Sequence, residues 1–94
     1  MLIVYGMMIC PDCVQCRQEL DGAGVMYEFR DFSESTKNLK EFLALRDTNP
    51  VFEGPRAEGK IGIPCLVTPE GRLTLDWREF LKYPAPERGG AGDQ

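Results

Sequence analysis

The chain contains 94 residues, 43% of them hydrophobic and 28% charged, which is the composition of one ordinary globular domain. Its formal net charge is −4 at pH 7, and its 11 Lys and Arg residues are scattered singly, so we do not expect it to bind nucleic acid. No apolar run approaches the roughly 20 residues of a transmembrane helix, so we do not expect a membrane protein either.

The chain begins with a fully apolar run, residues 2–5, which is typical of a buried strand. This beginning has neither a basic segment nor a cleavage site of small residues, so it does not match a signal peptide. We therefore expect the protein to stay in the cytoplasm, where thiols are kept reduced.

A first helix is predicted to follow a short loop, residues 6–9. Proline is favoured at the first position of a helix, so Pro11 makes Cys10 the N-cap residue. Asp12 then lies in the first turn, where its negative charge complements the helix dipole. Apolar residues continue at a spacing near 3.6, and the helix is expected to end at Gly22 or Gly24.

The middle of the chain predicts a strand, a helix and an irregular segment in that order. Residues 25–30 alternate apolar and polar, as in a strand with one buried face. Ser33 or Ser35 can cap a second helix. Pro and Gly interrupt the pattern over residues 47–60, which predicts a loop with room for a helical turn. The core face of the second helix is expected to contain Leu39, Phe42, Leu43 and either Leu45 or Arg46.

The last third of the domain predicts a hairpin and a final helix. Residues 61–67 indicate a strand entered through a proline, and a turn leads to an alternating strand over residues 72–75. Asp76 can cap a helix over residues 77–83. Its buried face is expected to contain Trp77, Phe80 and Leu81.

These segments give an α/β fold with the order β-α-β-α-β-β-α. Two strands joined by a helix are expected to pair in parallel, and the last two strands to form a hairpin. The result is a four-stranded mixed sheet with helices on both faces. Residues 84–94 have almost no apolar side chains and are expected to form a flexible tail outside the domain of residues 1–83.

The chain has four cysteines and no histidine, which makes cysteine the obvious reactive side chain. Cys10, Cys13 and Cys16 lie close together, and Cys65 lies far along the chain. A Cys-x-x-Cys pair by itself is compatible with zinc binding and with redox chemistry. Here the pair follows a first strand and opens a helix, which favours redox chemistry.

The predicted helix start gives a physical reason for that chemistry. Unpaired N–H groups and the positive end of the dipole favour a thiolate over a thiol, and the thiolate is the species that attacks a disulfide. The backbone of an N-cap residue is not helical, so the side chain of Cys10 can reach Cys13 and is the more exposed of the two. We therefore expect a thiol–disulfide oxidoreductase with Cys10 as nucleophile and Cys13 as resolving thiol.

Other functions stay open at this point. Cys10, Cys13, Cys16 and Cys65 could supply four thiolates to zinc, although Cys16 lies about 9 Å along the helix from Cys10 unless the helix unwinds. An iron–sulfur cluster bridged between two chains through Cys10 is less constrained. The domain could also act as an adaptor without turnover. The ordinary interpretation of Cys16 is a small buried side chain that packs on the sheet.

The chain resembles the glutaredoxins over residues 1–83, because a first strand, Cys10-Pro11-Asp12-Cys13 at a helix start, and Ile63-Pro64 before a strand occur in that order. The resemblance implies a thioredoxin-like fold and a monomeric disulfide reductase without a tightly bound cofactor. It implies that a cis peptide bond precedes Pro64 and that this loop lies against the active-site sulfurs. The implied partners are glutathione, as a possible electron donor, and protein disulfides. The implied substrate-binding residues are Pro11, Asp12, Ile63, Pro64 and Cys65.

The sequence also departs from the glutaredoxin pattern where that family holds glutathione. Met7 stands where a lysine is usual, Gly62-Ile63-Pro64 replaces Thr-Val-Pro, and Gly71 and Asp76 match the family's last motif poorly. We therefore expect glutathione-dependent turnover to be weak. Arg56 and Lys60 are the candidates to bind a carboxylate of glutathione in place of the residues that this sequence lacks.

Cys65 allows more than one interpretation. Side chains alternate along a strand, so Cys65 points away from the face of its neighbours and could be an inert core residue. A position directly after Pro64 could also bring it beside the redox pair, as a third thiol that forms an alternative disulfide with Cys10, or as a metal ligand.

Overall fold

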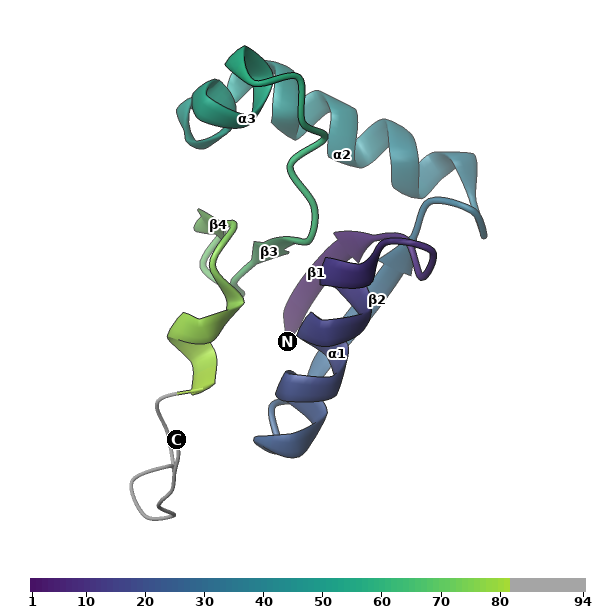
Figure 1. The fold of residues 1–94 in the computed structure, drawn as a ribbon, viewed down its shortest axis with the longest axis vertical. Helices are drawn as coiled ribbons and strands as arrows, with labels where there is room; N and C mark the ends of the chain where they lie inside the picture. The colour runs from purple at the N-terminus through teal and green to yellow at the C-terminus, as the bar shows by residue number, and fades with distance from the viewer. Residues whose placement is uncertain (82–94) are drawn as a thin grey trace.

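The computed structural model describes residues 1–81 and has one mixed sheet of four strands in the order β2-β1-β3-β4 (Figure 1). The central strand β1 (Leu2–Gly6) pairs in parallel with β2 (Tyr27–Asp31). On its other side β1 pairs antiparallel with β3 (Cys65–Val67), which pairs antiparallel with β4 (Leu73–Thr74). The predicted α/β class, the mixed sheet and the parallel first unit are confirmed.

Three α-helices and two 3₁₀ helices complete the described chain. Helix α1 (Pro11–Gly22) connects β1 to β2, and α2 (Thr36–Thr48) follows β2. A 3₁₀ helix η1 (Pro50–Phe52) leads directly into the short helix α3 (Glu53–Ala57). The second 3₁₀ helix, η2 (Trp77–Leu81), follows β4. None of these helices is long and apolar enough to cross a membrane within the described residues.

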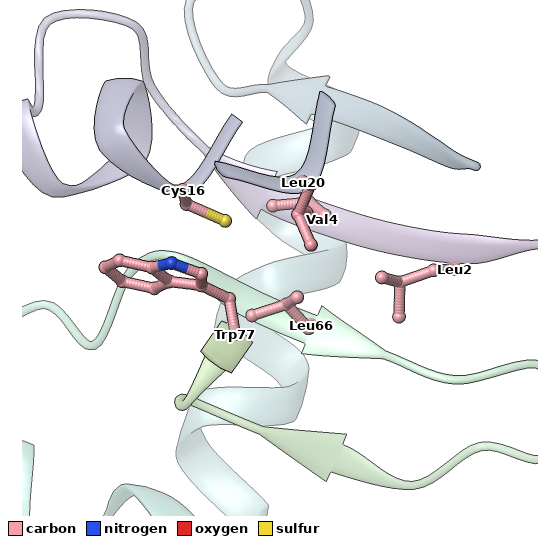
Figure 2. Packing of buried hydrophobic residues seen from close by; sticks show 6 residues of the cluster. All are labelled: Leu2, Val4, Cys16, Leu20, Leu66 and Trp77. Carbon is pink, nitrogen blue, oxygen red and sulfur yellow. The ribbon is translucent and has the colours of Figure 1, made fainter. Parts of the chain in front are cut away.

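The sheet separates two apolar clusters because alternate residues of its central strands face opposite sides. One cluster packs α1 and η2 against the sheet, and Figure 2 shows its buried side chains with Trp77 beside Cys16 at one end and Leu2 at the other. The other packs α2 and η1 against the opposite side. Helices on both faces of the sheet are therefore confirmed. The buried members are Leu2, Val4, Cys16, Leu20, Leu66 and Trp77 in the first cluster, and Tyr5, Phe32, Phe42, Phe52 and Cys65 in the second.

The N-terminal ends of the helices follow the predicted capping signals. Cys10 is the N-cap of α1, with proline next to it, and the Ser35 hydroxyl caps α2 by accepting a hydrogen bond from the N–H of Lys37. On α2, Phe42 is buried as predicted. Leu43 was also predicted to lie in the core, but it is 39% exposed. Leu39 and Leu45 pack partly against the second cluster.

The segment over residues 47–60, predicted as a loop with room for a helical turn, is more helical than expected, since it contains the end of α2, η1 and α3. The Asn49 side chain accepts a hydrogen bond from the N–H of Val51 and so starts a new turn next to Pro50. Phe52 is fully buried in the second cluster and ties these turns to the sheet. The burial of Phe52 thus stabilises helical turns in a segment whose Gly and Pro residues disfavour a helix.

The predicted strand over residues 61–67 is too long, because only Cys65–Val67 pairs with a neighbour. Gly62 has a φ of +92°, which is incompatible with a strand, and Pro64 has no N–H to donate. The partner strand is likewise shorter than residues 72–75. In Figure 1 the chain between α3 and β3 runs as an extended segment from the α2 side back to the sheet.

The final helix begins where expected but is a 3₁₀ helix rather than an α-helix. The Asp76 carboxylate accepts a hydrogen bond from the N–H of Arg78, as its predicted capping role requires. Trp77 is buried, and Phe80 and Leu81 pack partly against the first cluster. The predicted end of this helix and the tail of residues 84–94 lie outside the described residues.

Gly6 allows the start of α1 to lie close to the end of β1. A Cβ placed on Gly6 would lie 2.6 Å from Cys13 Sγ and 3.4 Å from the ring of Phe29. Cys13 is fully buried, so its sulfur has little room to shift. The position therefore requires a residue without a side chain.

We expect Gly6→Ala to lower the free energy of unfolding by about 1–3 kcal/mol, because an extra carbon overpacks this contact. Gly22→Ala is the matched control, since a Cβ there meets nothing within 4 Å. That control should be neutral or stabilising by about 0.5–1 kcal/mol, because alanine loses less backbone entropy than glycine in a helix. Urea unfolding measures both, and equal stability of the two variants would contradict the tight contact.

Candidate active site

Cys10 lies at the point where the loop after β1 turns into α1. Its backbone is extended (φ −88°, ψ 121°), its N–H donates to the carbonyl oxygen of Met7 at 3.1 Å, and its own carbonyl accepts from Val14. The side chain is half-buried and makes no capping hydrogen bond. The predicted N-cap position is confirmed, and it leaves the thiol accessible at the amino end of the helix.

Cys13 lies one turn further along α1 and is fully buried. The pKa of Cys13 is raised to about 12. Burial is the largest cause, and the neighbouring Cys10 side chain acts in the same direction. Cys13 therefore stays a neutral thiol near neutral pH. Both residues are free thiols, so the structure represents the reduced pair. Of the two, Cys10 alone combines exposure with a helix N-terminus.

The other two cysteines lie apart from each other on opposite sides of the sheet. Cys16 belongs to the cluster under α1, where Figure 2 shows it between α1 and Trp77, and Cys65 belongs to the cluster under α2. Both are fully buried, and burial raises the pKa of each thiol to about 12. Four thiolates split by a sheet in this way cannot meet at one tetrahedral zinc ion. Within residues 1–81 no group of three potential ligands is arranged to hold a metal.

Cys10 opens onto a groove of about 620 Å³ between the start of α1, the segment before β3 and the start of η2. Among the predicted site residues, Asp12, Ile63 and Pro64 line this groove with Cys10. The peptide bond between Ile63 and Pro64 is cis, as the resemblance implies. Pro11 and Cys65 do not line the groove; Pro11 is exposed, and Cys65 is fully buried under the sheet. The remaining lining residues are Met7, Ile9, Pro55, Gly59, Lys60, Ile61, Gly62, Leu75 and Trp77.

Asp31, at the end of β2, holds the loop that precedes Cys10, and the sequence did not point to it. Its carboxylate accepts a hydrogen bond from the N–H of Met8 at 3.2 Å and two from Ser33. Burial opposes the ionisation of this carboxyl, but the bonds from Ser33 and Met8 outweigh burial and lower the pKa of Asp31. An Asp with a Ser two residues later, at the end of a strand, is a local turn signal, whereas the contact with Met8 depends on the fold.

Arg46 of α2 holds the opposite wall of the groove. Its guanidinium donates to the carbonyl oxygens of Lys60 and Ile61, at 2.7 and 2.8 Å. It was predicted as a possible core residue of α2, and its role is instead to fix the backbone of the segment before β3. Because 15 residues separate Arg46 from Ile61, no local pattern announces this contact.

Comparison with known proteins places the chain beside one relative. A protein of Haemophilus influenzae, described as uncharacterized, is 39% identical over 74 residues, which cover 79% of this chain and 86% of the relative. The chain belongs to the family of that protein. No family model matches the chain. No solved structure matches it either. Family membership therefore extends over most of the described fold without assigning an activity.

The exposures of the four thiols, and the raised pKa values of the three buried ones, give a prediction for alkylation. When the reduced protein is treated with iodoacetamide near neutral pH, we expect Cys10 to be modified first. Cys13, Cys16 and Cys65 are fully buried, and the pKa of each lies at about 12, so little thiolate is available. Peptide mass mapping over time measures the order. Faster modification of Cys13 or Cys16 than of Cys10 would reverse the assigned roles.

The buried Cys65 gives a second prediction, on alkaline stability. Burial raises the pKa of this thiol from 9.0 to about 12 in the folded protein. Folding therefore favours the neutral thiol. The contribution of this preference to the free energy of unfolding is complete below about pH 9 and is lost as the pH rises toward 12. Cys65→Ala should be less stable at neutral pH but decline less steeply in this window. Urea unfolding at stepped pH measures both slopes, and parallel slopes would contradict the assignment.

Proposed function

We propose that the protein is a thiol–disulfide oxidoreductase of the thioredoxin fold, related to the glutaredoxins, in which Cys10 is the nucleophile and Cys13 the resolving thiol. The observation that carries the proposal is the contrast between the two sulfurs. Cys10 is half-exposed at the amino end of α1 and on a groove, whereas Cys13 is buried directly beside it. This is the division that a dithiol mechanism needs.

The arrangement of the elements supports this proposal. A β-α-β unit with the Cys-x-x-Cys pair at its helix start, followed by a helix and a hairpin, gives the strand order β2-β1-β3-β4. The peptide bond before Pro64 is cis, and Ile63 and Pro64 line the groove together with Cys10. Both features agree with the fold that the motif order implied.

The reaction proposed here moves two electrons from the dithiol to a substrate disulfide. The Cys10 thiolate attacks one sulfur, a mixed disulfide forms, and the other substrate sulfur leaves as a thiolate. Cys13 then loses its proton to solvent and attacks Cys10 Sγ, which releases the second substrate thiol and leaves a Cys10–Cys13 disulfide. An external dithiol or two molecules of a monothiol such as glutathione restore the reduced pair.

The effect of Cys10 on the pKa of Cys13 makes the order of these steps directional. Burial is the main cause of its raised pKa, but the hydrogen bond and the charge of Cys10 also raise it. Once Cys10 is part of a mixed disulfide it carries no charge, so this second contribution is lost. The resolving thiol therefore becomes easier to deprotonate only after the first attack has taken place.

The test uses the reduced protein and a soluble disulfide such as bis(2-hydroxyethyl) disulfide. We expect Cys10→Ser to reduce the rate to that of a reaction without protein, because no accessible thiol remains. Cys13→Ser should react once and stop as a mixed disulfide on Cys10, visible as an added mass.

Cys16→Ala is the matched control, since Cys16 lies in the core under α1 and not on the groove. It should keep most of the wild-type rate. Turnover that survives in Cys10→Ser, or a mixed disulfide on any other cysteine, would exclude the proposed mechanism.

A further inference from the structure

The groove beside Cys10 is lined mainly by apolar side chains that solvent can reach. Two of the lining residues are strongly exposed, Ile9 at 82% and Ile61 at 55%. Single exposed apolar residues are ordinary on a protein surface, but these two line one groove together with the Cys10 thiol. The apolar lining also includes Met7, Ile63, Leu75 and Trp77.

The charges around the groove do not suit an anionic ligand. Among the described residues that line it, Lys60 is the one cation and Asp12 the one anion. Lys60 Nζ lies 3.1 Å from a carboxylate oxygen of Glu58, so a negative charge accompanies this cation at the edge of the groove. Glutathione carries two carboxylates and one ammonium group, so its binding needs more positive charge than this groove offers. The other candidate cation, Arg56, is not a lining residue and donates to the carbonyl oxygen of Arg46.

The wall that carries Ile61 and Ile63 is held in place before any ligand arrives. Arg46 binds the carbonyl oxygens of residues 60 and 61. A Cβ on Gly62 would lie 2.8 Å from the ring of the fully buried Phe52, so this wall packs directly on the core. A surface fixed in this way loses little conformational entropy when it binds. The exposed apolar side chains are thus presented in a defined arrangement.

We propose that this groove selects a polypeptide disulfide whose cysteine is flanked by an apolar side chain, in preference to glutathione disulfide. The proposal rests on the proposed function and adds its substrate class. An apolar side chain next to the substrate cysteine packs on Ile61, Ile63 and Trp77, which places the adjacent sulfur against Cys10. The reaction is the exchange described above, with the peptide disulfide as oxidant of the reduced Cys10–Cys13 pair.

The first test compares substrates in single-turnover reactions of the pre-reduced protein. The substrates are symmetrical disulfides of two capped peptides, which differ only in a leucine or a serine before the cysteine, and oxidised glutathione. We expect the leucine peptide to react about tenfold faster than both others, which corresponds to roughly 1.4 kcal/mol. Equal rates for leucine and serine peptides, or a faster reaction of oxidised glutathione, would overturn the proposal. If none of the disulfides reacts, the proposed function itself fails.

The second test changes the groove and leaves the thiols intact. Ile61→Ser should lower the ratio of the rate with the leucine peptide to the rate with bis(2-hydroxyethyl) disulfide about fivefold, because the peptide loses an apolar contact that the small disulfide does not make. Met26→Ser is the matched control, because Met26 is 74% exposed and does not line the groove. It should change neither rate.

Thermal unfolding of Ile61→Ser and Met26→Ser checks that both variants fold. If Ile61→Ser does not fold, Ile9→Ser is used as the change in the groove instead. Equal losses with the peptide and with the small disulfide would mean that Ile61 affects the thiols rather than the substrate. That result, or an unchanged rate with the leucine peptide, would overturn the proposed selectivity.

Discussion

The contact between Cys13 and Gly6 is the constraint on which the candidate site depends. A Cβ on Gly6 would come within 2.6 Å of the sulfur, so the bare backbone of β1 is what lets α1 begin so close to the sheet. With Cys13 buried there, the N-cap residue Cys10, three positions earlier, lies at the edge of the groove. One close approach therefore determines both the inaccessible thiol and the accessible one.

The rest of the molecule holds the two walls of the groove against this fixed point. On one side, Asp31 binds the N–H of Met8 and so fixes the loop before Cys10. On the other side, Arg46 and Phe52 hold the segment that carries Ile61 and Ile63. The two walls are anchored from different elements, one from β2 and the other from α2 and η1. The groove is thus a product of the fold rather than of one loop.

Local patterns in the sequence were sufficient for the elements that depend on caps and periodicity. The start of α1 at Pro11, the cap of α2 at Ser35 and the cap at Asp76 all follow from residue types whose effects extend only a few positions. The same local chemistry placed Cys10 at the N-cap of α1 and Cys13 one turn further along it, as the structure has them. Sequence reasoning could therefore predict the order of elements, the sheet and the position of the thiols on α1.

The errors lie where distant contacts decide the conformation. The helical turns after Asn49 form because Phe52 is buried in the core, and the positive φ of Gly62 goes with its packing on the same ring. The parts played by Arg46 and Asp31 depend on partners 15 and 23 residues away. A burial or a hydrogen bond of that range has no local signature, and so the walls of the groove could not be derived from one sequence.

Trp77 is the only tryptophan of the chain, and it belongs to the core under α1 and to the groove of Cys10 at the same time. Its indole N–H donates to a Glu19 oxygen at 2.7 Å, and this bond is the largest cause that lowers the pKa of Glu19. The tryptophan fluorescence of the protein therefore comes from one ring, which has a defined polar partner and lines the same groove as Cys10. Unfolding and occupation of the groove change the surroundings of that same ring, so one emission spectrum reports on both without an attached dye.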